Sequence, residues 1–230
     1  MRQLQKLLFI FPIVLLIQCT SAPQGEKVTA TDAKEISGVR GEQFSIDEKQ
    51  SFIEWEGTKP MGKHFGKIFP KNGIIGVENG TISGGTIVID MNSILCLDLE
   101  DSNLNQKLVG HLKSNDFFAV DSFPTSTFEI TELMPLEKSS DTSSDDTPDR
   151  THLAKGNLTM RGVSKGIEFP VKVSFDNQIV RVTSPAFTIN RTLWRVNYGS
   201  KSIFAELKDN FIHDEMGIKL DIVFVKNSAN

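Results

Sequence analysis

Apolar and polar residues alternate along most of the chain after its first forty residues. In the segment GIEFPVKVSF, apolar side chains recur at every second position and alternate with Glu168, Lys172 and Ser174. The apolar positions are Ile167, Phe169, Val171, Val173 and Phe175. The segment GIKLDIVF repeats the pattern, with apolar residues at Ile218, Leu220, Ile222 and Phe224. A period of two predicts antiparallel strands that have one buried and one solvated face.

Turn signals separate these strands from several others. Asn79-Gly80 stands between two apolar runs in 72–91 and predicts a hairpin with a two-residue turn. The residues FDNQ at 175–178 predict a second turn. Further strands are expected at 44–47, 51–57, 125–134, 151–160 and 178–189. About eight strands joined mostly by short turns predict an all-β domain, either a closed barrel or a sandwich.

One segment breaks the alternation. Leu104, Leu108 and Leu112 recur every four residues, which predicts a helix with one apolar stripe. Asn103, followed by Gln106 three residues later, is typical of a capping box and places the helix start there. We expect this helix to end near 114–115 and a second short helix to cover roughly 201–210.

Two adjacent phenylalanines, Phe117 and Phe118, follow the helix. Successive residues of an extended segment point to opposite sides. We therefore expect one ring to close the barrel end and the other to pack under the helix. A core corner and a contact with a ligand both stay open for the pair at this point.

The first residues are typical of a bacterial lipoprotein signal peptide. A cationic start precedes an apolar run at 7–17, which is too short to span a membrane as a helix. The LIQC that follows resembles a lipobox and predicts a signal peptide over 1–19 with lipidation of Cys19. Cleavage near 20–22 is the alternative, and it would discard the cysteine.

The same region predicts where the protein resides. Thr20 stands where inner-membrane retention signals carry Asp, which favours an exported lipoprotein of the bacterial cell envelope, on the periplasmic side of the outer membrane. Residues 20–41 are small, polar and aperiodic, and we expect a flexible tether there. One barrel domain then occupies 42–228, with a mobile hairpin loop expected at 137–150.

Composition argues against nucleic acid as a partner. The chain has 25 Lys and Arg residues against 29 Asp and Glu, and removal of the signal peptide leaves 23 against 29. Binding to nucleic acid requires a basic stripe. An acidic chain without such a stripe is not expected to bind DNA or RNA.

Motifs for catalysis or metal binding are absent from the sequence. There is no Gly-x-Ser-x-Gly elbow and no glycine-rich phosphate loop. His64, His111, His152 and His213 are far apart in the chain and give no metal-ligand spacing. Cys96 lies in an apolar run and is expected to be buried. We expect neither an enzyme nor a resident metal or cofactor.

Three segments resemble the YceI-like family. They are HLKSNDFFAVDSFPTSTF at 111–128, GNLTMRGVSKGIEFPVKVSF at 156–175 and GGTIVIDMNSI at 84–94. The first shows the family's helix, Asp-Phe-Phe, Phe-Pro and strand, and the second its Gly-x-Leu-Thr-x-Arg-Gly-Val-x-Lys hairpin. The resemblance covers roughly residues 42–226, and the segments WEGTKPMGKHFGKI and INRTLWRVNYGS differ from the family pattern.

The resemblance implies an eight-stranded antiparallel barrel, lipocalin-like in shape, with one or two short helices. It also implies a non-catalytic protein that holds an apolar-tailed lipid, such as a polyisoprenoid, a quinone or a fatty acid, in the barrel interior. A barrel of eight strands is just wide enough to hold one slim ligand or to be filled by its own side chains. A surface-interaction or structural module with a filled barrel is therefore the alternative.

Candidate ligand-binding residues are the inward-facing strand residues, the phenylalanine pair and two cationic side chains near the helix and a hairpin. They are Ile87, Ile89, Phe117, Phe118, Phe128, Leu158, Phe169, Val171, Val173, Phe187, Ile222, Phe224, Arg161 and His111. Lys63, His64, Arg191 and Arg195 are candidates for contact with a polar head such as phosphate. Trp55 and Trp194 are expected to pack in the wall.

Overall fold

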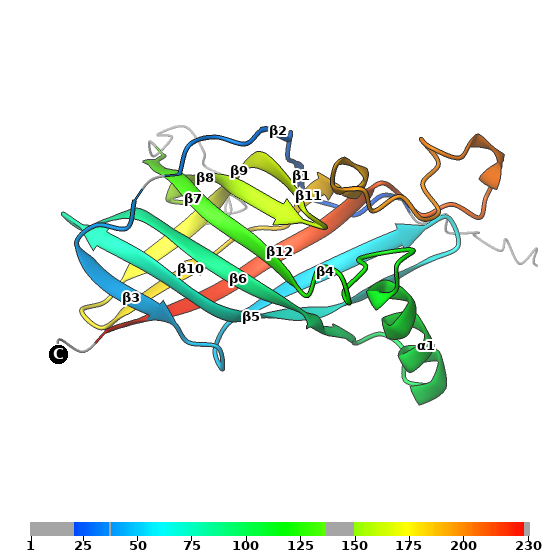
Figure 1. Ribbon diagram of the computed structural model, residues 1–230, viewed down its shortest axis with the longest axis horizontal. Helices are drawn as coiled ribbons and strands as arrows, with labels where there is room; N and C mark the ends of the chain where they lie inside the picture. The colour runs from blue at the N-terminus through cyan, green and yellow to red at the C-terminus, as the bar shows by residue number, and fades with distance from the viewer. Residues whose placement is uncertain (1–20, 37, 137–149, 228–230) are drawn as a thin grey trace, which may run out of the picture.

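A computed structural model describes residues 21–36, 38–136 and 150–227, which form twelve strands, one α-helix and two 3-10 helices (Figure 1). The strands are β1 (Glu26–Lys27), β2 (Thr31–Asp32), β3 (Glu42–Ile46), β4 (Phe52–Lys59), β5 (Gly62–Glu78), β6 (Thr81–Cys96), β7 (Thr125–Pro135), β8 (His152–Met160), β9 (Val163–Phe175), β10 (Ile179–Thr183), β11 (Phe187–Asn190) and β12 (Glu215–Lys226). The helices are α1 (Ser102–Lys113), η1 (Arg191–Trp194) and η2 (Ala205–Leu207).

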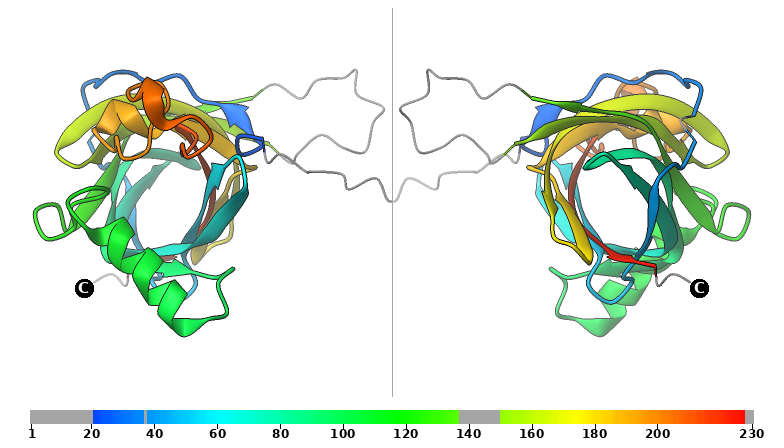
Figure 2. Two further views of the ribbon diagram at one scale, coloured as in Figure 1. Left: turned by 90° about the vertical axis from the view of Figure 1, so that its right-hand side faces the viewer. Right: turned by 90° about the vertical axis from the view of Figure 1, so that its left-hand side faces the viewer.

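The sheet closes into a ring of about eight strands, as predicted. Hydrogen bonds run in the order β12, β10, β9, β8, β7, β6 and β5, and β3 and β4 both join β5 back to β12. The pairs around the ring are antiparallel, and β11 occupies the edge of β12 beyond β10. Figure 2 shows the ring from its two ends, with α1 at one of them. The open choice between barrel and sandwich is thereby decided for the barrel.

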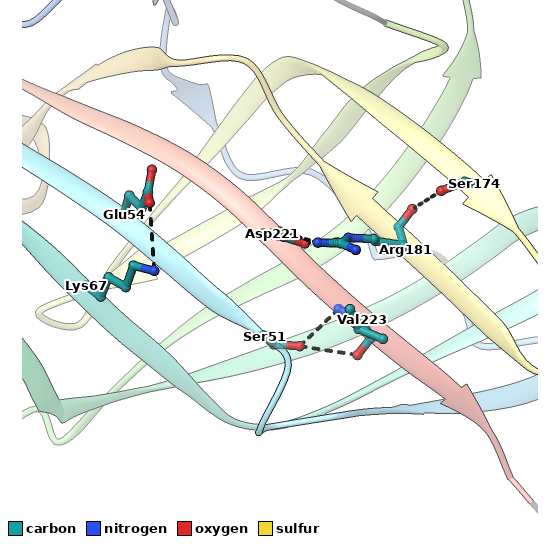
Figure 3. A network of polar contacts seen from close by, with 7 residues as sticks. All are labelled: Ser51, Glu54, Lys67, Ser174, Arg181, Asp221 and Val223. Atoms are coloured by element: carbon teal, nitrogen blue, oxygen red, sulfur yellow. Dashed lines mark hydrogen bonds and ion pairs between the residues drawn. The ribbon is translucent and has the colours of Figure 1, made fainter.

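Polar side chains link β12 to β10 and to the residue just before β4 (Figure 3). The Ser51 hydroxyl, at the start of β4, accepts a hydrogen bond from Val223 N at 2.9 Å and donates to Val223 O at 3.3 Å. Arg181 on β10 binds both carboxylate oxygens of Asp221 on β12, at 2.8 and 2.6 Å. These contacts join neighbouring strands, and the Arg181–Asp221 pair leaves the apolar positions of both strands directed inward.

Turn chemistry explains the longest hairpin. Asn79 and Gly80 have φ values of 53° and 75°, so the turn between β5 and β6 is left-handed at both positions, which suits Asn-Gly. The turn predicted at 175–178 is also present between β9 and β10. Phe175 differs from its predicted inward orientation because it lies at this hairpin end, where its side chain is 41% exposed.

The strand predicted over 178–189 is two strands, β10 and β11, which pair with different parts of β12. Ser184 lies in the break, where its backbone N–H donates to Leu220 O and its hydroxyl accepts from Leu220 N. The Ser184 hydroxyl therefore takes the place of a backbone carbonyl as the acceptor for Leu220 N–H, where the strand pairing is interrupted. The sequence carries a signal for this break, because the alternating apolar positions change from Val180 and Val182 to Phe187 and Ile189 across Ser184-Pro185.

Helix α1 lies where the sequence predicted it, but its cap is different. The Asp101 carboxylate accepts hydrogen bonds from Asn103 N and Leu104 N, so Asp101 is the N-cap and the predicted capping box at Asn103 is wrong. A carboxylate at the N-cap satisfies free N–H groups of the first turn. The helix ends at Lys113, as expected, and the short helix predicted over 201–210 is the single 3-10 turn η2.

The segment before β3 does not form the tether predicted over 20–41. β1 pairs in parallel with β11, β2 pairs with β9, and Val28 between them is only 7% exposed. Pairing with strand edges satisfies the backbone of a segment whose own side chains bury little apolar surface. The packed domain therefore begins before residue 42.

Several predictions fall outside the described residues. These are the signal peptide over 1–19, the lipidation of Cys19 and nearly all of the loop at 137–150. Among the residues that the structure describes, none of the helices has the length and apolar character needed to cross a bilayer.

Candidate functional site

An internal cavity of about 160 Å³ lies within the ring. Its wall is formed by residues of β4, β5, β6, β7, β8, β9, β11 and β12, with α1, η1 and the segments that follow α1 and η2. The lining residues are Ile53, Trp55, Gly57, Ile68, Ile87, Ile89, Met91, Ile94, Leu112, Phe117, Phe118, Ser126, Phe128, Leu158, Met160, Ile167, Phe169, Phe187, Ile189, Arg191, Ile212, His213, Glu215, Met216, Ile218, Leu220 and Ile222. The wall is therefore almost wholly hydrocarbon.

Nine of the fourteen candidate ligand-binding residues line this cavity. They are Ile87, Ile89, Phe117, Phe118, Phe128, Leu158, Phe169, Phe187 and Ile222. Phe169 is central among them, because its ring stacks on Phe187 at 4.4 Å between centroids and lies 5.5 Å from Phe128. The strands thus bring together apolar rings that are up to 59 positions apart in the chain, between Phe128 and Phe187.

Val171, Val173 and Phe224 point inward as predicted but do not line the cavity. They are 0%, 7% and 1% exposed and belong to the packed core. Phe224 is opposite Val180 on β10 and Ile46 on β3 in the strand register. We call the part of the barrel that contains Val171, Val173, Val180 and Phe224 the packed half, and the part that surrounds the cavity the hollow half.

The cavity is elongated and small in cross-section. On β12, the lining residues run from Glu215 to Ile222, about 24 Å of strand at about 3.4 Å per residue. An apolar cavity of about 150 Å³ stays dry and accepts a ring such as benzene. The cavity as it stands therefore accepts a slim apolar group, and a longer chain requires its side chains to shift along the same path.

Both phenylalanines of the pair line the cavity, which corrects the prediction that they would separate. The segment after α1 is a turn and not an extended strand, with Ala119 at φ 49° and Phe118 N donating to Leu112 O. The two rings meet edge to face at 5.2 Å. A turn can direct successive side chains to the same side, so Phe117 and Phe118 together close the α1 end of the hollow half.

Arg161 fixes the turn that carries this pair. One Arg161 Nη1 donates to Phe117 O at 2.6 Å and to Arg195 O at 2.7 Å, and its Nη2 donates to Asn115 O at 3.2 Å. The guanidinium is therefore engaged with backbone carbonyls and does not line the cavity. His111, the other predicted cationic contact, lies outside the cavity wall with its ring 4.5 Å from that of Tyr198.

Arg191 reaches the cavity wall, in contrast to Arg161. Its three guanidinium nitrogens donate to His213 O, Val196 O and Ile212 O, at 3.2, 2.5 and 3.1 Å. Burial lowers the pKa of Arg191, and the carboxylate of Asp214 at 3.9 Å opposes that shift. The Arg191 side chain therefore stabilises the segment before β12 through hydrogen bonds to its backbone carbonyls.

Among the lining residues, Trp55 was predicted to pack in the wall, whereas the sequence did not single out His213 and Glu215. Trp55 has the inward parity of Ile53 on β4, and Gly66 on β5 leaves space for its indole: a Cβ at Gly66 would lie 2.8 Å from Trp55 Cζ2. Glu215 binds Lys27 at 2.9 Å. The alternation of β4 predicts the orientation of Trp55, but no sequence signal places His213, which lies in a segment without periodicity.

A second cluster joins His64 to Cys96 and Asp98, which are neighbours in sequence but more than thirty positions from His64. His64 Nδ1 lies 2.8 Å from Asp98 Oδ2, and Cys96 Sγ lies 3.3 Å from Asp98 Oδ1. Burial raises the pKa of the Cys96 thiol, whereas hydrogen bonds from Phe65 N, His64 and Cys96 outweigh burial and lower the pKa of Asp98. Their donor atoms lie within 4.8 Å of one another, so the trio has the spacing to hold a metal ion that the sequence did not predict.

Comparison with known proteins gives the same architecture. The chain is similar to BcnA of Burkholderia cenocepacia, at 17% identity and a TM-score of 0.56, over 77% of this chain and 98% of that one. It is also similar to a polyisoprenoid-binding domain of Saccharophagus degradans, at 14% identity and a TM-score of 0.56, over 80% of this chain and 98% of that one. At such identities the likeness establishes the fold.

A search of curated proteins finds no match to the chain. The profile of the YceI-like domain matches residues 44–224, which is most of the chain and includes all or most of every strand of the ring. The match, the ring of strands and the apolar cavity agree with the resemblance seen in the sequence. The chain belongs to the YceI-like family.

Proposed function

We propose that the protein is a non-catalytic lipid-binding barrel that holds an isoprenoid or fatty-acyl chain in its hollow half. The observation that carries the proposal is the elongated cavity with a hydrocarbon wall inside a closed ring of strands. The polyisoprenoid binding named for the Saccharophagus degradans domain supports the same ligand class for this barrel.

Burial of an apolar tail supplies enough free energy for this role. Transfer from water is worth about 0.8 kcal/mol per methylene, so ten buried carbons give about 8 kcal/mol before the costs of association. Apolar rings such as Phe128, Phe169 and Phe187 make the wall complementary to a chain without polar groups. Burial of the tail then supplies the binding free energy, and contacts with a polar head are needed only to orient the ligand.

We further propose that the protein works outside the cytoplasm, anchored through a lipid on Cys19 to the periplasmic side of the outer membrane. The proposal rests on the signal-like residues 1–17 and the LIQC that follows them. A Cys19→Ala variant should lose incorporation of labelled palmitate and leave the membrane fraction, with the Cys96→Ala variant as the matched control. Incorporation that survives Cys19→Ala would contradict lipidation at this residue.

Lipid binding is tested on the purified and delipidated chain. Native mass spectrometry after incubation with farnesol or a long fatty acid should show a single added ligand per chain. Failure of all such ligands to bind would refute the proposal and favour the alternative of a filled structural module. The variant that fills the cavity, described below, distinguishes binding inside the barrel from binding to its surface.

A further inference from the structure

The cluster of His64, Cys96 and Asp98 contains three kinds of side chain that bind transition metals. His64 lies on β5, Cys96 is the last residue of β6, and Asp98 follows it in the segment before α1. His64 Nδ1 lies 2.8 Å from one Asp98 oxygen and Cys96 Sγ lies 3.3 Å from the other. The three donor atoms all lie within 4.8 Å of one another, so an imidazole, a thiol and a carboxylate converge outside the cavity.

The spacing of these atoms is close to that of a tetrahedral metal centre. A zinc ion lies about 2.3 Å from a cysteine sulfur and about 2.0–2.2 Å from a histidine nitrogen or a carboxylate oxygen. Ligand atoms around one tetrahedral zinc ion are therefore about 3.3–3.6 Å apart. The observed separations differ from that range by no more than about 1.2 Å, which side-chain rotation can supply.

Backbone pairing and α1 hold the cluster on a fixed frame. Leu97 N donates to Phe65 O at 2.9 Å, which joins the strand of the histidine to the segment of the other two ligands. Phe65 N donates to Asp98 Oδ1 at 2.9 Å, and the Asn105 side chain of α1 donates to Cys96 O at 3.0 Å. Ligands that are carried by strands and oriented by further hydrogen bonds are suited to bind an ion without a large rearrangement.

Burial and charge at the cluster suit a divalent cation. Cys96 is buried, whereas the side chains of His64 and Asp98 are partly exposed and give an ion access from solvent. One thiolate and one carboxylate balance the two charges of Zn²⁺, and the imidazole binds as the neutral form. A coordinated thiol is deprotonated by the ion itself, so binding releases the Cys96 proton to solvent.

The lysines that flank His64 on β5 are each paired with a carboxylate. Lys63 Nζ lies 2.8 Å from Glu56 Oε2, and Lys67 Nζ lies 3.9 Å from Glu54 Oε1. These pairs reduce the repulsion that the two ammonium groups exert on a cation bound nearby.

We propose that His64 Nδ1, Cys96 Sγ and an Asp98 oxygen bind one Zn²⁺ ion, with a water molecule in the fourth position. Zinc accepts mixed nitrogen, sulfur and oxygen ligands, whereas Mg²⁺ and Ca²⁺ require oxygen ligands. The ion cross-links β5 to the segment between β6 and α1 and so stabilises the end of the barrel that α1 covers. The site is separate from the cavity and does not depend on the proposed lipid binding.

Metal titration of the full chain tests the site. The parent chain carries Cys19→Ala, which leaves Cys96 as its single cysteine, and is freed of metal with EDTA. Isothermal titration calorimetry with Zn²⁺ should give one ion per chain, and Zn²⁺ should raise the melting temperature because it binds the folded state. Co²⁺ in its place should give the visible bands of a tetrahedral centre and a near-ultraviolet charge-transfer band from the thiolate.

Substitution of each ligand assigns the ion to the cluster. Loss of an outer partner of a metal ligand already costs about 10- to 100-fold in affinity. Cys96→Ser, His64→Gln and Asp98→Asn should therefore each weaken Zn²⁺ binding at least tenfold, and Cys96→Ser should abolish the charge-transfer band. His111→Gln is the matched control, because this histidine lies outside the cluster, and it should bind Zn²⁺ as the parent chain does.

Three results would overturn the proposal. They are a parent chain that does not bind Zn²⁺, a Co²⁺ complex without the thiolate band, and an affinity that all three substitutions leave unchanged. The last result would mean that the ion is bound elsewhere on the chain. The measurements on the parent chain need no substitution in the cluster, so they decide the question even if a variant fails to fold.

Discussion

On β12, Phe224 and Ile218 are both inward-facing apolar residues, but the barrel is filled around the first and hollow beside the second. Phe224 is 1% exposed among Val180, Val171 and other core residues of the packed half. Ile218, six positions earlier on the strand, lines the cavity together with Trp55 and Phe187, its neighbours in register. The same alternation therefore produces a solid core in one half and a binding cavity in the other.

The neighbouring elements account for this difference. In the packed half, β3 and β10 lie against the end of β12 and bring in Phe44, Ile46 and Val180. In the hollow half, the corresponding positions are taken by β4 and β11, and the end is closed by loop residues such as Phe117 and Phe118. Loops at the barrel end cover the interior without filling it.

Truncation of a large inward side chain should give the largest change in the free energy of unfolding. The loss should be greater in the packed half than in the hollow half. Phe224→Ala should lower the free energy of unfolding by about 3–5 kcal/mol, because it opens a new void in a packed core. Leu220→Ala, on the same strand but beside an existing cavity, should cost about 2 kcal/mol. Urea denaturation measures both, and equal losses would contradict the distinction between the halves.

Enlarging an inward-facing side chain should also affect the two halves differently, both in stability and in lipid uptake. Val173→Trp has no free space in the packed half and should cost about 1–3 kcal/mol or more. Ile218→Trp should cost less, since the indole can occupy the cavity, and should abolish uptake of farnesol in native mass spectrometry. If the folded Ile218→Trp variant binds lipid as well as the wild type does, the lipid is not held in the cavity.

Loss of Arg161 tests how the hollow half is closed. Arg161→Ala removes donors to three carbonyls near Phe117 and should lower the free energy of unfolding by about 1–3 kcal/mol. Hydrogen exchange of the amides at 115–120 should rise. Arg181→Ala, which removes an exposed ion pair with Asp221, is the control and should cost about 0–1 kcal/mol.

The smallest effect on stability is expected from the protonation of His152, in the packed half, as the pH falls. His152 is the partner of Val171 in the strand register, and burial lowers its pKa from the usual 6.5. The folded state therefore binds this proton less readily than the unfolded state, so stability present above pH 6.5 is lost as the pH falls below it. His152→Gln should flatten the pH dependence of the melting temperature between pH 7 and 5, and an unchanged slope would exclude His152 as its source.

Local patterns in the sequence predicted the wall of the barrel well. Alternation identified the strands, and Asn79-Gly80 identified the hairpin between β5 and β6, because both signals depend on neighbouring residues. Nine of the fourteen residues predicted to contact a ligand also line the cavity. The N-terminal segment was predicted wrongly, since its ordering comes from the distant edges of β9 and β11 and not from its own composition.

The sequence by itself determined the class of fold, the inward face of each strand and the resemblance to the YceI-like family. Only the tertiary structure decided which inward side chains meet a void and that Phe117 and Phe118 share one wall. Side-chain direction follows from the local period of a strand. Filling and hydrogen bonding depend on residues more than a hundred positions apart, which become neighbours only when the ring closes.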